Sequence, residues 1–163
     1  PVAPNPHWVD VSNDGTRLYA ANHESNVVTI LDTATNTPIT TVAVELSPHS
    51  ILAHPTESLL YNVNYDSSSM SVTDLNTNTV IATVPTASHP QDVSLAPDGR
   101  HGYLATVDDN AIQVFDAKTF QITARVPTGR SPTSIAVAPN GRQAYVTNLN
   151  DGTVTVLNIA GTA

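Results

Sequence analysis

Short segments of alternating apolar and polar residues follow one another along the whole chain. The segment 8–12 places Val9 and Val11 on one face, and the segment 27–31 does the same with Val28 and Ile30. Alternation with a period of two is typical of a half-buried β-strand. Asp, Asn, Gly or Pro, which favour turns, follow most of these segments. The pattern therefore predicts an all-β protein built from short antiparallel strands.

The strand pattern recurs every 42 residues without an insertion or a deletion. Three rows of residues mark this period: Pro6, Pro48, Pro90 and Pro132; Tyr19, Tyr61, Tyr103 and Tyr145; and Asp32, Asp74, Asp116 and Asn158. Four strands in a repeat of this length describe one blade of a β-propeller. We expect a single propeller over residues 1–163, with repeats at about 6–47, 48–89, 90–131 and 132–163. The last repeat ends early, so its blade should lack the outer strand.

Within one repeat, strands are expected at 8–12, 18–22, 27–31 and 38–44. Asp-Gly or Asn-Gly forms the first turn in three repeats, whereas Thr56-Glu57 in the second predicts a different turn. The Asp that ends the third strand should cap the next turn. The periodic tyrosines should lie in identical packed environments with hydrogen-bonded hydroxyls, and Trp8 should pack between blades.

Several motifs go beyond periodicity. Residues 145–148 read Tyr-Val-Thr-Asn, residues 96–99 and 138–141 read Ala-Pro-Asp-Gly and Ala-Pro-Asn-Gly, and residues 153–158 read Thr-Val-Thr-Val-Leu-Asn. These motifs closely resemble the YVTN-type β-propeller repeat, and the resemblance covers essentially the whole chain. It implies the propeller fold. It leaves function open, since that family spans surface-layer and adhesion-like proteins, periplasmic binding proteins and relatives of cytochrome d1-like and quinoprotein-like propellers.

The resemblance also implies a ring of seven or more blades, which four repeats do not complete. Three arrangements stay open: the chain is part of a longer propeller, two chains self-associate into an eight-bladed ring, or four blades close alone. The chain begins with Pro1 rather than Met. We therefore expect that a leader or a longer N-terminal region has been removed.

Composition excludes several functions. The net charge is −8 with only 6 Lys and Arg, which argues against nucleic acid and against docking on anionic lipid. No apolar run approaches the roughly 20 residues that a membrane span needs. The absence of cysteine excludes disulfides, thiolate metal sites and haem attached through cysteine. An acidic, Lys-poor and Thr-rich β-protein fits an exported prokaryotic protein, whether periplasmic, cell-surface or extracellular.

The variable polar residues concentrate in two kinds of loop. In a propeller blade, the loop between blades and the loop joining the second and third strands lie at the same end. We expect a ligand- or partner-binding face at this end, formed by His7, Trp8, His23, Glu24, His49, Asp66, His89, Gln91, Asp108 and Asp109. His54 and His101 should lie at the opposite end.

Three histidines on this face suggest a metal site. Neutral imidazoles at His7, His23 and His49 suit a divalent ion such as zinc or copper. The alternative is that these are solvated loop residues, and a compact motif such as His-Glu-x-x-His is absent. No cofactor is predicted apart from this divalent metal.

No catalytic motif stands out. Ser, His and Asp occur without a Gly-x-Ser-x-Gly elbow, and the glycines do not cluster into a phosphate-binding loop. We therefore expect a non-enzymatic binding or scaffold module with a protein or surface partner on the loop face. The alternative is a blade set from a periplasmic redox enzyme of the cytochrome d1-like or quinoprotein-like kind, with a metal or haem on that face.

Overall fold

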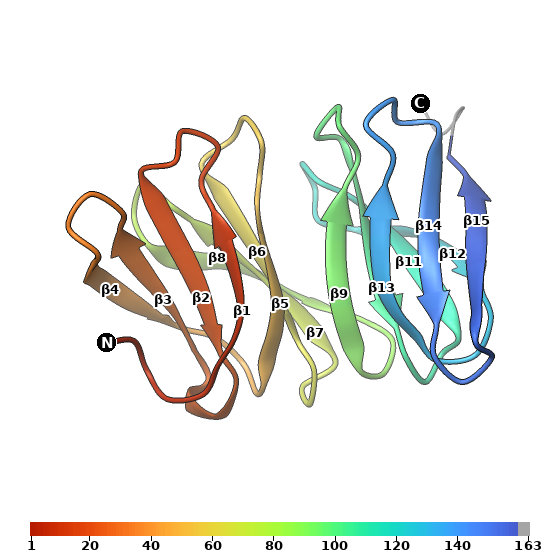
Figure 1. Ribbon diagram of the computed structural model, residues 1–163, viewed down its shortest axis with the longest axis horizontal. Helices are drawn as coiled ribbons and strands as arrows, with labels where there is room; N and C mark the ends of the chain where they lie inside the picture. Colours follow the sequence, from red (N-terminus) through yellow and green to blue (C-terminus); the bar gives the residue numbers. More distant parts are fainter. Residues whose placement is uncertain (160–163) are drawn as a thin grey trace. The chain divides into compact units, whose positions relative to one another are not determined.

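The computed structural model describes residues 1–159 and confirms the all-β class. Fifteen strands and one short 3₁₀ helix, η1 (His23–Ser25), make up the regular structure of the described residues (Figure 1). The strands form four antiparallel sheets, and in each sheet the spatial order follows the chain. These are propeller blades. No helix in the described part is long and apolar enough to cross a membrane.

The chain divides into two compact units, Pro1–Pro85 and Thr86–Ala163, each containing two blades. In unit 1, blade 1 comprises β1 (Pro6–Val11), β2 (Arg17–Asn22), β3 (Val27–Asp32) and β4 (Thr37–Ala43). Blade 2 comprises β5 (Pro48–Ala53), β6 (Leu59–Asn64), β7 (Ser69–Asp74) and β8 (Thr79–Pro85).

In unit 2, blade 3 comprises β9 (Pro90–Leu95), β10 (His101–Thr106), β11 (Ala111–Asp116) and β12 (Ile122–Pro127). Blade 4 comprises β13 (Pro132–Val137), β14 (Gln143–Asn148) and β15 (Thr153–Asn158). Up to residue 159, blade 4 therefore has three strands, as the repeat pattern predicted.

The first turn of each repeat follows the sequence prediction. Gly15, Gly99 and Gly141 adopt positive φ values of 71°, 69° and 67°, which glycine tolerates without strain. The second repeat differs as expected: Nδ1 of His54 accepts hydrogen bonds from the backbone N–H groups of Thr56 (3.2 Å) and Glu57 (2.9 Å). A side-chain acceptor thus replaces the left-handed glycine in this turn.

The Asp that ends the third strand caps the following turn, which confirms its structural role. Asp32 accepts hydrogen bonds from the backbone N–H (2.8 Å) and the hydroxyl (3.0 Å) of Thr35. Asp116 does the same with the backbone N–H groups of Thr119 (2.7 Å) and Lys118 (2.9 Å). These bonds stabilise the ionised form, so the pKa of each carboxyl lies below its usual value.

Blades stack through apolar faces within each unit. In unit 1, buried residues of blade 1 such as Ile30 and Val42 pack on Ile51 and Leu60 of blade 2. Unit 2 has an equivalent core with members from blades 3 and 4: Tyr103, Ala105, Ile112, Val114, Ile135, Ala144 and Val146. A single blade could not bury its apolar faces alone, so stacking supplies most of the hydrophobic stabilisation.

The periodic tyrosines do not share one environment, contrary to the expectation. Tyr19, Tyr61 and Tyr103 are at most 3% exposed, whereas Tyr145 is 42% exposed. Within unit 2, blade 4 packs on blade 3 through the opposite face, so its tyrosine face has no neighbour there. The Tyr145 hydroxyl instead lies 3.1 Å from Oε1 of Gln143, to which it donates a hydrogen bond.

Candidate functional site

Five aromatic or imidazole side chains gather at one end of unit 1, and we call them the ring cluster: His7, Trp8, His23, His49 and Tyr65. The ring centroids of His7 and His49 are 4.0 Å apart. The centroid of His23 lies 5.6 Å from that of His7 and 6.0 Å from that of His49. The rings of Tyr65 and Trp8 lie 5.7 and 6.5 Å from His49. The structure thus brings together four side chains of the predicted face.

The repeat explains why these rings meet. His7 is the second residue of β1 and His49 the second residue of β5, so they are equivalent positions on the adjacent inner strands of blades 1 and 2. His23 opens η1, and Tyr65, directly after β6, is its equivalent one repeat later. Two rows of the repeat therefore meet where neighbouring blades stack.

Hydrogen bonds fix the loops around the ring cluster. Asp66 Oδ2 accepts a hydrogen bond of 2.5 Å from the Ser47 hydroxyl, and Glu45 accepts one from the Ser69 hydroxyl. The buried Asn22 donates from Nδ2 to the Ala3 carbonyl at 2.7 Å. Two carboxylates of the neighbouring loops are thus held by serine hydroxyls.

The side chains at this end of unit 1 differ in their exposure to solvent. His7, Trp8, Glu24 and Asp66 are exposed, whereas His23, His49 and Tyr65 are half-buried. Trp8 of blade 1 is 40% exposed, and its ring lies 6.5 Å from that of His49 on blade 2, so it is only partly covered where the two blades meet. Over residues 1–159, no three or more His, Cys, Asp or Glu side chains form a group that could hold a metal ion as they stand. The three predicted histidines are close together, but they are not in a coordinating arrangement.

The predicted residues of unit 2 form local pairs. His89 Nδ1 lies 2.5 Å from Asp108 Oδ2. Asp109 accepts hydrogen bonds from the Arg125 guanidinium at 2.5 and 3.1 Å, and this pairing raises the pKa of Arg125 above its usual value. Gln91 is half-buried on β9. His89, Asp108 and Asp109 therefore have structural partners within unit 2.

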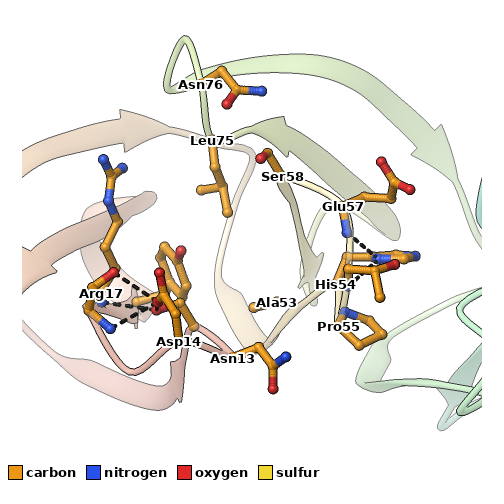
Figure 2. A pocket seen from close by; sticks show the side chains of 14 residues that line it. Asn13, Asp14, Arg17, Ala53, His54, Pro55, Glu57, Ser58, Leu75 and Asn76 are labelled. Carbon is orange, nitrogen blue, oxygen red and sulfur yellow. Dashed lines mark hydrogen bonds between the residues drawn. The ribbon is translucent and has the colours of Figure 1, made fainter.

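The opposite end of unit 1 carries a polar pocket of about 340 Å³ between the first turns of blades 1 and 2. Figure 2 shows Asp14 and Arg17 on one side of this pocket and His54 and Glu57 on the other. Asp14 accepts hydrogen bonds from the Ser12 hydroxyl (2.6 Å) and from the backbone N–H (3.0 Å) and hydroxyl of Thr16 (2.8 Å). These bonds lower the pKa of Asp14 to about 2.

Sequence reasoning missed Tyr65 and this pocket. Tyr65 could have been found by following the His23 row into the next repeat, where an aromatic ring replaces the imidazole. His54 could have been found as the residue that replaces Ser12, Ala96 and Ala138 in the one repeat without a glycine turn. In both cases the signal was a deviation from the repeat rather than a catalytic motif.

The stacked antiparallel blades and the variable loop end define a β-propeller protein. Residues 2–89, more than half of the chain, match the family described as Lactonase, 7-bladed beta-propeller. The chain belongs to this family. The resemblance to YVTN-type repeats agrees with that assignment, while kinship to cytochrome d1-like or quinoprotein-like propellers stays a prediction.

A solved structure of hydrazine synthase from Kuenenia stuttgartiensis contains a chain of similar fold. The TM-score is 0.90, the sequence identity is 26%, and the match covers 96% of the present chain. It covers 47% of the hydrazine synthase chain, so the present chain spans about half of that length. No curated protein sequence matches the chain significantly.

Proposed function

We propose that this chain is part of a non-enzymatic binding module of an exported prokaryotic protein, and that the ring cluster contacts its partner. The observation that carries this proposal is the convergence of His7, Trp8, His23, His49 and Tyr65 at one loop end. Trp and Tyr are enriched among the residues that dominate binding energy at protein interfaces. The acidic, Lys-poor and Thr-rich composition supports export.

Charge selects the kind of partner. The chain carries a net charge of −8, and Glu24, Glu45 and Asp66 belong to the loops beside the rings. Arginine and lysine side chains stack on aromatic faces and pair with carboxylates. A cationic polypeptide segment therefore complements this end of unit 1 better than an acidic one does.

The sole tryptophan of the chain offers a direct test, since Trp8 lies beside His49 in the ring cluster. Its fluorescence is followed while the protein is titrated with a short Arg/Tyr peptide or with its Glu/Tyr counterpart, in EDTA. We expect a saturable change with the cationic peptide only. Tyr65→Ala should weaken this binding by about tenfold, as for a typical interface anchor, whereas His101→Ala in unit 2 should not. Equal responses to both peptides, or no response, would contradict the proposal.

Catalysis provides a second test of the same proposal. The family name refers to lactonases, so hydrolysis of glucono-δ-lactone is followed with a pH indicator. We expect no rate above that of buffer, because the proposal gives the ring cluster a binding role only. A rate that is lost in a His49→Gln variant would replace the binding function with an enzymatic one.

The likeness to a hydrazine synthase chain favours a second candidate function. In this alternative the blades belong to a larger periplasmic redox enzyme that holds a metal or haem at the histidine-bearing end. The test is the visible absorption spectrum and metal content of the natural full-length polypeptide. A haem band would support the redox enzyme, and a colourless, metal-free preparation would support the binding module.

A further inference from the structure

We propose that the polar pocket between the first turns of blades 1 and 2 binds a small neutral saccharide. This pocket of about 340 Å³ lies at the end of unit 1 opposite the ring cluster, so the proposal stands independently of the binding function proposed above. Small-molecule sites typically enclose about 300–1,000 Å³. The pocket therefore has the size for a ligand of one or two sugar rings.

A buried tyrosine hydroxyl at the pocket carries this proposal. Tyr19 is 1% exposed, its ring belongs to the apolar core between blades 1 and 2, and it lines the pocket. Over residues 1–159 its hydroxyl makes no hydrogen bond, and it is not one of the unpartnered polar atoms that the protein encloses completely. The hydroxyl is therefore reached from the pocket. Buried tyrosine hydroxyls normally have a hydrogen-bond partner, so we expect a ligand to supply it.

Charged side chains of the pocket offer further hydrogen-bonding atoms. The three hydrogen bonds that Asp14 accepts within its own turn all go to Oδ1, so Oδ2 can accept one from a ligand. In the described part of the chain, the guanidinium of Arg17 and the carboxylate of Glu57 have neither a hydrogen-bond nor an ion-pair partner. Figure 2 shows Asp14 and Arg17 on one side of the pocket and Glu57 on the other. Carboxylate acceptors thus lie on both sides, and Arg17 provides donors.

This mixture of charges selects a neutral ligand with several hydroxyl groups. Asp14 and Glu57 disfavour an anion, and Arg17 disfavours a cation, because juxtaposed like charges repel each other. A hydroxyl group both donates and accepts a hydrogen bond. Neighbouring sugar hydroxyls can therefore donate to the two carboxylates and accept from Arg17 and from the hydroxyl of Tyr19. Leu75 also lines the pocket and provides an apolar surface for the C–H groups of a sugar ring.

Saturation-transfer NMR with glucose, galactose, mannose, maltose and lactose tests the site. We expect saturable binding of at least one of these sugars, and weaker binding of glucuronate and glucosamine, which carry opposite charges on a similar ring. Tyr19→Phe removes only the hydroxyl and should weaken sugar binding by about two- to tenfold, as for the loss of one hydrogen bond. Arg17→Met keeps the aliphatic stem and should weaken it by more than about tenfold, since a hydrogen bond from a charged group is lost.

Tyr145→Phe is the matched control, because that hydroxyl donates to Gln143 in unit 2 and should not affect sugar binding. Tyr19→Phe should keep the Tm of the parent, since it removes a hydroxyl without a partner in the described chain. The inference is overturned if no sugar binds, if glucuronate or glucosamine binds more tightly, if Tyr19→Phe melts well below the parent, or if both Phe variants bind sugar equally well. Tyr65→Ala in the ring cluster should bind sugar as the parent does, so the two proposals can fail separately.

Discussion

Replacement of Gly102 with alanine should destabilise unit 2, because Phe115 fills the space where a β-carbon would lie. The two residues are partners across β10 and β11, and Phe115 is fully buried. A β-carbon on Gly102 would lie 1.9 Å from Cζ and 2.2 Å from Cε1 of that ring. Non-bonded carbons require about 3.5–4.0 Å. The ring must therefore move by roughly 1.5–2 Å within a packed core.

Overpacking a core typically costs about 1–3 kcal/mol, and a fully buried ring places Gly102→Ala near the upper end, at about 3 kcal/mol. Phe115→Leu alone removes part of the ring and should cost about 1 kcal/mol. Blade 4 pairs Ala144 with Leu157 at the equivalent positions. The double variant recreates that pair, so its free energy of unfolding should lie within about 1 kcal/mol of that of the parent. The coupling energy between the two substitutions is then about 3 kcal/mol.

Urea unfolding followed by circular dichroism measures these free energies of unfolding. In a thermal scan, the Gly102→Ala loss should lower Tm by roughly 6–12 °C for a chain of this length. The double variant should recover most of that decrease. The reasoning from the Phe115 contact is wrong if the free energy of unfolding of Gly102→Ala lies within about 0.5 kcal/mol of that of the parent. It is also wrong if the losses caused by the two single substitutions add up to the loss in the double variant.

Three further predictions concern other parts of the fold. The Asp14 carboxylate, with a pKa of about 2 in the folded chain against a usual 3.8, stabilises the fold above about pH 4 and ceases to do so as the pH falls towards 2. Urea midpoints between pH 2 and 6 should therefore fall less steeply in Asp14→Asn than in the parent, and parallel curves would contradict this. Asp92→Ala should lower the free energy of unfolding by about 2–3 kcal/mol, because the buried N–H of Ile135 loses its acceptor at 2.9 Å; urea unfolding within 0.5 kcal/mol of the parent, roughly the limit of such a comparison, would refute it. Tyr145→Ala should cost less than about 1 kcal/mol and Tyr103→Ala more than about 3 kcal/mol, and equal losses in urea unfolding would contradict the exposure difference.

The regular part of this fold could be predicted from the sequence. The segment expected at 18–22 is the strand β2 (Arg17–Asn22), and the turn expected to differ at Thr56 is the one built around His54. A strict period makes such predictions reliable, because four copies of the same pattern distinguish the shared scaffold from local variation. The row of His7 and His49 likewise placed both residues at one end of the blades.

Distances between side chains, and paired changes in side-chain size, could not be predicted in this way. The repeat places His7 and His49 in one row, but only the stacking of the blades determines that their rings lie 4.0 Å apart. The exchange of size between Gly102 and Phe115 depends on cross-strand register, and the sequence gives no sign of it without the pairing. Tyr145 differs from the other tyrosines because of what covers its blade, which is a property of the neighbour rather than of the repeat.

Residues with left-handed backbone recur just before the third strand of every repeat, with φ between 51° and 62° at Asn26, Ser68, Asn110 and Gly152. Each of these bends is specified inside the 42-residue segment that it shapes. A duplicated or deleted copy of that segment would keep its bends intact, without matching changes elsewhere in the polypeptide. Recombination can therefore add or remove whole blades, one repeat at a time.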